Sequence, residues 1–394
     1  MKHLSLIIML LISFCLFAEP VDYAGPDFAQ GFYDMYSKNF INAEMAGRGH
    51  SGIAFTGGAE YGNHNPATLL DTYNNLYFEI AIKPRVTEFN ELQDNKYQSN
   101  SPINAVGFTL APFGNFHLGF MYSLENSLEY YSFSRTLPQT TTTIDYTPEY
   151  YNHRISLMFA HQLTDKLSYG INSNLHIHSF KEYRNEGKVD LLNFQESFLQ
   201  LQPGVLYQTD YVNIGASFLP SVDVDYKYKY IDYKMTIPAE INAGATLKLK
   251  NNLYILADTD YTFYSQQADY MENQLTWKLG IEKQVKNPFD MLGDYSLRAG
   301  YIYKPKVFSG EYNVPDYSNP AHDEFHPNFY HDIPSMGRIS AVDMSYLTVG
   351  TSVRINHDVE LNLAYLADLK GDLKLNQFIS SLKFDLAVFK YLKK

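Results

Sequence analysis

Apolar and polar residues alternate along most of the chain after residue 75. Between 253 and 263 the odd positions carry Leu, Ile, Ala, Thr, Tyr and Phe, while the even positions carry Tyr, Leu, Asp, Asp and Thr. Between 359 and 370 the odd positions are apolar, and the even positions bring Glu, Asn, Asp and Lys to the other face. A period of two is typical of β-strands. One face suits lipid and the other a wet lumen, so the pattern predicts the wall of a barrel.

Fourteen such segments are predicted as strands, at 76–88, 103–111, 116–126, 153–162, 167–180, 196–207, 211–224, 236–248, 253–263, 275–284, 295–304, 345–355, 358–369 and 376–388. Short links alternate with longer ones between them, as the periplasmic turns and external loops of outer-membrane barrels do. The sequence therefore predicts an all-β, transmembrane antiparallel β-barrel of about fourteen strands. An even count places both ends of the barrel in the periplasm.

The composition agrees with strands rather than helices as the membrane-spanning elements. Mean hydropathy is −0.29, and beyond the first residues no apolar run reaches the roughly 18 residues that a spanning helix needs. The 34 Tyr and 26 Phe suit aromatic girdles at the two membrane interfaces. A net charge of −12 disfavours nucleic acid as a partner.

The first eighteen residues have the form of a cleavable signal peptide. Lys2 and His3 precede an apolar run that ends at Phe17, and Ala18 stands before a polar residue. Cleavage there removes Cys15, the only cysteine. A lipoprotein reading of Cys15 is the alternative, although Phe14 occupies a position that favours a small residue. We expect the mature chain in the bacterial outer membrane.

Residues 19–75 lack sustained alternation and are rich in glycine. The glycines are Gly47, Gly49, Gly52, Gly57, Gly58 and Gly62, followed by Asn65, Pro66 and Ala67. Such a stretch can turn tightly in a confined space, so we predict an N-terminal hatch, or plug, inside the lumen. A disordered periplasmic tail is the alternative. The predicted organisation is signal peptide 1–18, hatch 19–75 and barrel 76–394.

Four stretches, in this order along the chain, resemble the FadL/TodX family of hydrophobic-compound transporters. The run from Ala46 to Phe55 with Asn65-Pro66-Ala67 is similar to the family's N-terminal hatch. The other three stretches are similar to its later strands: 237–244 with 257–265, then 297–301 with Pro305, then Ile333-Pro334 with 347–350.

The resemblance implies a fourteen-stranded barrel that takes up hydrophobic molecules at its external loops. Release would follow through the wall or past the hatch. The implied function is passive outer-membrane transport of hydrophobic or amphipathic small molecules, either fatty acids or aromatic hydrocarbons. The implied partners are outer-membrane lipid, the hydrophobic ligand and the barrel assembly machinery, whose signal we place at Phe384, Phe389 or Tyr391. The alternative is a scaffold or secretion-associated barrel that holds other outer-membrane or secreted proteins without transport.

Motifs typical of enzymes are weak in this chain. Residues 47–52 match G-x-G-x-x-G, but no predicted strand precedes them and no βαβ unit follows. Residues 49–53 fall short of a nucleophile elbow because Ile53 stands where the last glycine belongs. We predict no enzyme activity and no cofactor. The loop from His322 to Asp332 could ligate a cation, but solvated loop is its default reading, so no metal site is predicted.

Polar residues on the inward face of the strands are the candidates for contact with a solute. They are His176, His178, Glu240, Asp258, Asp260, Arg298, Arg354 and Glu360. The two histidines are interpreted as part of a hydrogen-bonded lumen wall, with a role in solute passage as the alternative. For the charged residues, mutual structural pairing is the first interpretation and ligand binding the second.

Overall fold

The computed structural model describes residues 39–70, 75–82, 103–129, 133–136, 143–184, 189–228, 231–266, 272–286, 293–307, 343–355, 359–369 and 376–385. The predicted signal peptide and the loop from His322 to Asp332 lie outside these residues.

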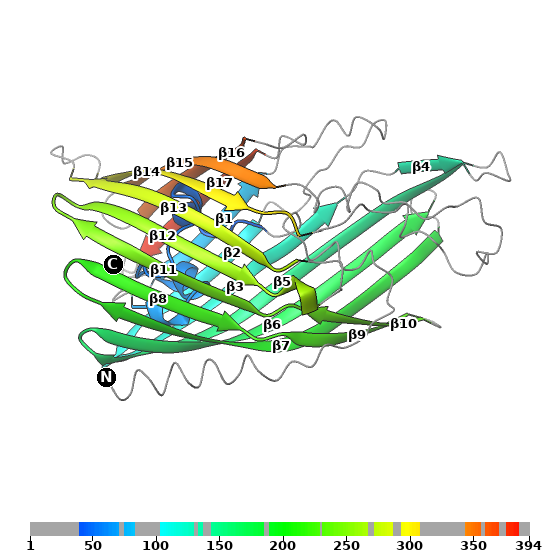
Figure 1. The fold of residues 1–394 in the computed structure, drawn as a ribbon, viewed down its shortest axis with the longest axis horizontal. Coiled ribbons are helices and arrows are strands. Elements are labelled where there is room, and N and C mark those ends of the chain that lie inside the picture. The colour runs from blue at the N-terminus through cyan, green and yellow to red at the C-terminus, as the bar shows by residue number, and fades with distance from the viewer. Residues whose placement is uncertain are drawn as a thin grey trace, which may run out of the picture.

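Fourteen antiparallel strands form a closed barrel (Figure 1). They are β1 Asn75–Ile82, β2 Ile103–Phe113, β3 Phe116–Glu129, β5 Thr143–Thr164, β6 Leu167–Arg184, β7 Val189–Gln208, β8 Val212–Leu219, β11 Glu240–Leu249, β12 Leu253–Thr262, β13 Gln274–Val285, β14 Tyr295–Lys304, β15 Met344–Ile355, β16 Val359–Asp368 and β17 Gln377–Asp385. The first and last strands close the ring, with Asn75 opposite Asp385. Closure satisfies the backbone hydrogen bonds that an open sheet edge would expose to lipid.

Each of the fourteen predicted strands corresponds to one strand of this barrel, so the predicted fold class is confirmed. One difference concerns the predicted strand 211–224, which ends at Leu219 as β8. The chain then forms β9, Val222–Tyr228, which pairs only with β10, Ile231–Ile237, among the described strands. Pro220 follows β8 and Pro238 follows β10. Proline has no N–H to donate to a ladder, so barrel pairing ends before Pro220 and resumes only after Pro238, at Glu240 of β11.

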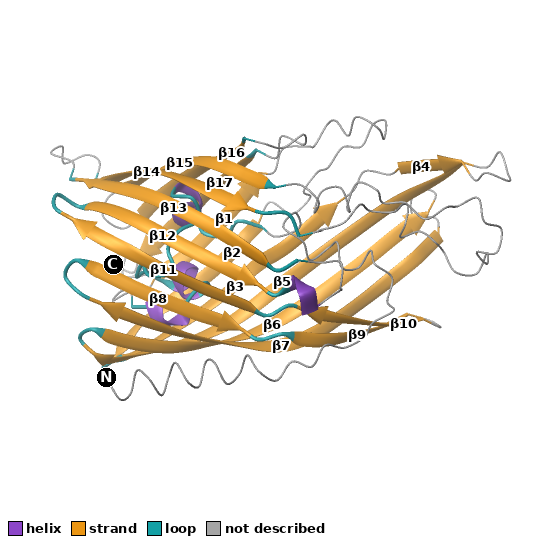
Figure 2. Ribbon diagram, in the orientation of Figure 1, coloured by secondary structure: helices purple, strands orange, loops and turns teal. Residues whose placement is uncertain are grey.

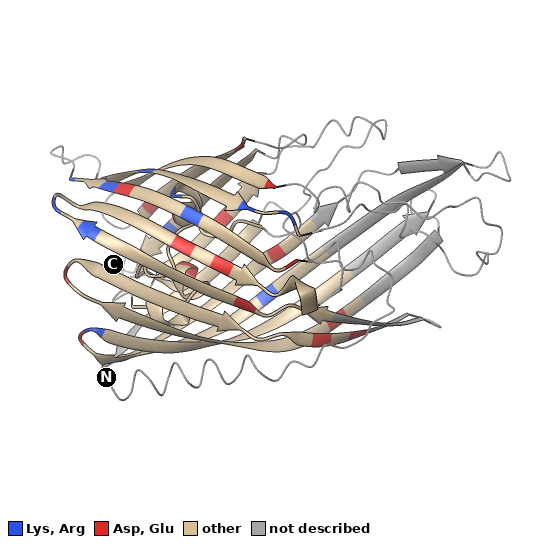
Figure 3. Cartoon of the chain, in the orientation of Figure 1, with Lys and Arg blue, Asp and Glu red and all other residues tan. Residues whose placement is uncertain are grey.

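The outer wall of the barrel is apolar. Large side chains such as Leu279, Leu297 and Leu347 are about half exposed, while their inward neighbours Lys278, Arg298 and Thr348 are buried. Charged residues occupy only short stretches of the strands in Figure 3, most of whose length is tan. The alternation read from the sequence therefore assigns the lipid-facing side correctly in these strands. No helix within the described ranges is long and apolar enough to cross a membrane.

Replacing Leu279 with Arg tests the assignment of the outer face. The change places a charge in lipid near the middle of β13, and we expect the free energy of unfolding to fall by about 2–4 kcal/mol. Leu279→Ala keeps the position apolar and should cost clearly less. Reversible denaturant unfolding from lipid vesicles gives both values, and equal losses would contradict the assignment.

Residues 39–70, called the inner segment below, lie within the ring of strands (Figure 2). The segment contains α3 Ala43–Gly47, α4 Ala59–Gly62 and the 3₁₀ turn η1 Pro66–Thr68. Asn42 begins α3 because its side-chain oxygen accepts hydrogen bonds from the backbone N–H groups of Glu44 and Met45, at 3.0 and 3.2 Å. Nearly all of the segment is buried, so it fills space that strand side chains leave open.

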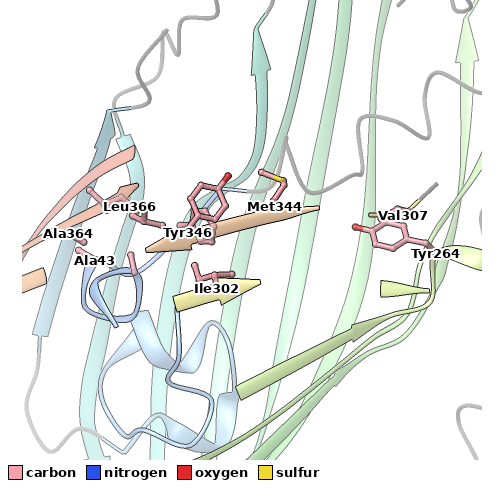
Figure 4. Packing of buried hydrophobic residues seen from close by; sticks show 11 residues of the cluster. Ala43, Tyr264, Ile302, Val307, Met344, Tyr346, Ala364 and Leu366 are labelled. Atoms are coloured by element: carbon pink, nitrogen blue, oxygen red, sulfur yellow. The ribbon is translucent and has the colours of Figure 1, made fainter. Parts of the chain in front are cut away.

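Apolar clusters pack the inner segment against separate parts of the wall. In the first, Ala43 of α3 lies beside Tyr346 of β15 and Ala364 of β16 (Figure 4). In the second, Ile41, Ala59 and Leu69 join side chains from the first strands of the barrel. In the third, Ala54 and Ala67 meet Leu206 of β7. Burial on these sides stabilises one position of the segment in the lumen.

Candidate functional site

Two carboxylates of the wall hold the backbone of the inner segment. Asp258 of β12 accepts hydrogen bonds from the N–H groups of Gly52 and Ile53, at 2.5 and 2.9 Å. Glu79 of β1 accepts from the N–H groups of Asn42 and Ala43, at 3.2 and 2.6 Å. Buried N–H groups need acceptors, and a carboxylate forms stronger hydrogen bonds than a neutral group does.

Neutral side chains of the wall also form hydrogen bonds with the backbone of the inner segment. Thr109 Oγ1 accepts from Ala59 N–H at 2.8 Å, and Thr348 Oγ1 accepts from Gly49 N–H at 2.8 Å. Carbonyl groups of the segment are bound in the same way, by Ser168 to Ala67 at 2.9 Å, Asn172 to Gly62 at 2.8 Å and Asn213 to Ala54 at 3.1 Å. The contacts come from β2, β15, β6 and β8, so they surround the segment.

Glycines on the inner face of the wall allow the backbone of the segment to come this close. A Cβ added at Gly300 of β14 would overlap the backbone of Arg48 and Gly49, and one at Gly215 of β8 would overlap the carbonyl oxygen of Ile53. Gly215 stands opposite Gly244 in the strand register. Elsewhere in the barrel Gly280 stands opposite Gly300, and Gly170 opposite Gly204.

A buried ion-pair network joins the inner segment to β13 and β14. Arg48 Nη1 donates to Glu282 Oε2, and Arg298 Nε donates to the same oxygen at 2.9 Å. Arg298 Nη2 reaches Glu44 of α3 at 3.2 Å. The Tyr61 hydroxyl donates to Glu44 at 2.8 Å and accepts from Arg48 Nη2 at 2.5 Å. Two carboxylates thus balance two guanidinium groups, as burial of charge requires.

The inner segment also contains titratable groups whose pKa values depart from their ordinary range. Burial lowers the pKa of Arg48, but Tyr61, Glu282 and Glu44 together raise it above the ordinary value, so the guanidinium stays charged. Burial raises the pKa of Tyr61 well above its usual range. Burial, with Lys278 nearby, holds the pKa of His50 well below its usual range, so this imidazole is neutral.

The predicted hatch residues all lie in the inner segment. Gly47 ends α3 against Gly350 of the wall, Gly49 has φ +71°, and Gly52 donates to Asp258 as described. Asn65 Nδ2 donates to the carbonyl oxygen of Val205 in β7 at 3.1 Å. Pro66 and Ala67, in η1, pack against Gly170 of β6.

The predicted lumen residues fall into separate groups. His176 and His178 flank Phe198 of β7, and His176 Nδ1 lies 3.1 Å from Asn152 Oδ1. Arg298 belongs to the buried network, Asp260 pairs with Lys278, and Glu240 lines a cavity. Arg354 and Glu360 pair at 3.3 Å with half of the arginine side chain exposed, so this arginine is not buried in the lumen. Asp258 was expected to pair with a positive charge. Instead, its Oδ2 accepts hydrogen bonds from two backbone N–H groups of the inner segment.

Sequence reasoning missed several residues that hold the inner segment. The sequence predicts no role for Glu79 or Glu282, and it places Arg48 only within the stretch that resembles the hatch and within the G-x-G-x-x-G match. Strand alternation does indicate that Glu79 and Glu282 point into the lumen. Glu79 lies on the same strand face as Tyr77, and Glu282 on the same face as Lys278. Nothing in the sequence indicates that Arg48 reaches across to β13. No three metal-ligating side chains gather within the described residues.

Two cavities lie beside the inner segment. The cavity toward the long loops, called the loop-side cavity, has a volume of about 140 Å³ and is lined by Phe40, Ile41 and His50 among others. The cavity toward the short turns has a volume of about 250 Å³ and is lined by Glu44, Phe55 and other residues. Different residues of one segment thus border both spaces, so the segment stands between them.

Comparison with known proteins defines the fold. The sequence matches no family model and no curated protein. The toluene transporter TbuX of Ralstonia pickettii superposes with a TM-score of 0.60 at 14% identity, covering 88% of this chain and 98% of that one. A FadL homologue of Pseudomonas aeruginosa gives 0.60 at 12% identity, with the same coverage. The toluene transporter TodX of Pseudomonas putida gives 0.54 at 14% identity, covering 89% and 97%.

These likenesses extend over most of each chain. Together with the closed ring of strands and the apolar outer wall, the fold places the protein in the bacterial outer membrane. The chain is an outer-membrane β-barrel with the FadL-like fold.

Proposed function

We propose that this barrel is a passive transporter of hydrophobic or amphipathic small molecules across the outer membrane, with the inner segment as its hatch. The position of the inner segment between two cavities carries the proposal. A solute that enters from the loop side meets the segment before it can reach the turn side. The contacts of the segment with the surrounding wall support a closed resting state.

Barrel size gives a physical reason for a hatch. Eight strands leave an interior that side chains can fill, whereas sixteen leave an aqueous channel. A barrel of fourteen strands is closer in size to the sixteen-stranded channel, so an inserted element is needed to make the pore selective. Passive movement down a concentration gradient needs no further machinery.

The apolar part of the loop-side cavity supports a hydrophobic solute. Phe40, Ile41 and Ile53 of the inner segment line it together with Leu219 of β8 and Ile237 of β10. The proteins with this fold include two toluene transporters, and a third, CymD, is described as a monoaromatic hydrocarbon channel. Fatty acids and aromatic hydrocarbons are therefore the first solutes to test.

A scaffold role is the second candidate, favoured by the length of three neighbouring strands. β5, β6 and β7 contain 22, 18 and 20 residues, whereas about 9–11 residues cross a bilayer. These strands run beyond their neighbours toward the loop end, where β4 (Phe133–Thr136) joins β5 (Figure 1). A sheet that extends beyond the membrane surface would suit a protein partner.

Solute uptake distinguishes the two functions. Vesicles whose outer leaflet contains lipopolysaccharide are loaded with the protein, and entry of labelled oleate and labelled toluene is compared with entry into empty vesicles. The transport proposal expects faster entry of at least one solute. Equal rates for both would contradict it and leave the scaffold role as the better account.

A further inference from the structure

The hairpin formed by β9 and β10 belongs to no ladder of the barrel. The two strands pair with each other over their whole length, beginning with Val222 opposite Ile237. Among the described strands, neither pairs with a strand of the barrel. Pro220 precedes the hairpin and Pro238 follows it, and proline cannot donate to a ladder at either junction. The hairpin is therefore a separate small sheet with a proline at each of its two attachments.

A seam without ladder hydrogen bonds separates this hairpin from β7. β8 pairs with β7 only between Gly204 and Gln208, and the next residue of β7 toward the loops is Pro203. Beyond that point β9 runs beside β7 without a ladder in the described part of the chain (Figure 1). Gln200 Nε2 crosses the seam and donates to the carbonyl oxygen of Pro220 at 2.6 Å. On its other side β7 stays paired with β6, so β7 remains a fixed edge of the seam.

Both edges of the seam border the loop-side cavity. Leu219 at the end of β8 lines this cavity, as do Ile237 and Pro238 at the base of the hairpin. Gln200 and Gln202 of β7 line it from the opposite edge. Since residues from the two edges surround one space, a movement that widens the seam opens the cavity.

The length of β8 places the seam near the outer surface of the membrane. β8 begins after a short turn and contains eight residues, while about 9–11 residues cross a bilayer. Leu201 and Leu199 are the first outward-facing residues of β7 beyond Pro203, and both are exposed. They give the seam an apolar rim at the level where a hydrophobic or amphipathic solute reaches the barrel.

We propose that the β9–β10 hairpin is a flap, and that the seam between it and β7 is the entrance through which solute reaches the loop-side cavity. The flap moves as one unit about Pro220 and Pro238, and the contact between Gln200 and Pro220 holds it closed. No ladder of the barrel breaks during this movement. The inference rests on the proposed transport function and adds the route of entry to it.

Distances between spin labels test the movement independently of transport. One label is attached through Asp210→Cys in the short turn before β8, and the second through either Asp225→Cys in the flap or Ser197→Cys in β7. All three positions are exposed. Double electron–electron resonance in lipid nanodiscs should give a broad or two-peaked distance distribution for the pair in the flap. The pair in β7 should give one narrow peak, because β6 holds β7 at this point. One narrow peak for both pairs would overturn the flap.

A crosslink across the seam tests the entrance. Leu199→Cys with Ser221→Cys places one thiol on each side, next to the contact between Gln200 and Pro220. After a flexible bis-maleimide joins the two thiols, we expect uptake of labelled toluene and oleate to fall to the rate of empty vesicles. Mass spectrometry confirms the crosslink, and the heat-modifiable mobility of the barrel on a gel confirms that the variant is folded.

The matched control is a crosslink within the hairpin. Asp223 and Thr236 stand opposite each other in its ladder, and Thr236 Oγ1 donates to Asp223 Oδ1 at 2.7 Å. The same reagent on Asp223→Cys with Thr236→Cys joins the two strands of the flap without tying the flap to β7. Uptake should therefore continue unchanged in this variant.

The outcomes separate this inference from the transport proposal. Uptake that persists after the seam is crosslinked, or that is lost equally in the control, would overturn the entrance and leave transport standing. Uptake no faster than in empty vesicles before any crosslinking would overturn the transport proposal and, with it, the role of the seam as an entrance.

Discussion

Deleting residues 47–67 is expected to turn a closed barrel into an open pore. The strands keep their own ladder of hydrogen bonds, so the barrel still forms, while the lumen loses most of the element that fills it. Single-channel recording in planar bilayers should show conductance rising from near zero to that of a water-filled channel. A deletion protein that folds and conducts no more than wild type would mean that wall side chains alone close the lumen.

A single substitution in the full-length chain should also raise the conductance. Gly300→Leu forces a side chain into the backbone of Arg48 and Gly49, so the inner segment must move away and conductance should rise. Ala299→Leu, one residue earlier, changes the lipid-facing side of the same strand and should leave conductance unchanged. Equal behaviour of the two variants would contradict the contact between segment and wall.

Removing the charge of Glu282 should produce the largest loss of stability among single substitutions in the buried network. Glu282→Gln leaves Arg48 and Arg298 buried with one carboxylate between them instead of two. Removing one partner of a buried ion pair typically costs about 3–5 kcal/mol. Denaturant unfolding from vesicles measures the loss, and hydrogen exchange of residues 43–62 shows whether the inner segment loosens first.

Glu360→Gln is the matched control, since Glu360 also pairs with an arginine on an inward strand position. Its partner Arg354 is half exposed, so water compensates the loss, and we expect a cost of about 1 kcal/mol or less. Equal losses for Glu282 and Glu360 would show that the buried network does not hold the segment. The double variant Arg48→Met with Glu282→Leu should recover part of the stability, because no isolated charge then remains on this pair.

The strands could be predicted from the sequence because each carries its own signal. A lipid-facing wall imposes alternation on every strand, as Leu279 beside Lys278 illustrates, and antiparallel neighbours joined by short turns need no long-range information. Where Pro220 interrupts a strand, alternation continues into β9, so the sequence pattern alone could not show that β9 leaves the barrel.

The attachment of the inner segment could not be predicted in the same way. Asp258 and Glu79 bind backbone N–H groups, and any residue except proline supplies such a group, so the sequence of the segment carries no sign of these partners. Contacts such as Arg48 with Glu282 join positions more than 200 residues apart and depend on the closed barrel. The role of the segment as a hatch remains a prediction that needs direct measurement.

A disulfide between the inner segment and the wall gives that measurement. A Cβ at position 107 of β2 would lie 3.3 Å from the Cβ of Ala59, near the spacing of about 3.5–4.5 Å found in disulfides. It would also lie 2.9 Å from the backbone oxygen of Phe120, so Gly107→Cys alone is needed as a control. The sequence has one cysteine, Cys15, within the predicted signal peptide, so Ala59→Cys with Gly107→Cys introduces one defined pair.

Uptake of labelled oleate and toluene into lipopolysaccharide-containing vesicles is then compared before and after reduction, with Ala59→Cys alone and Gly107→Cys alone as the controls. If the segment is the hatch of a transporter, uptake is slow in the oxidised protein and is restored by the reductant, while neither single variant responds. Equal uptake in the oxidised and reduced states would contradict the account.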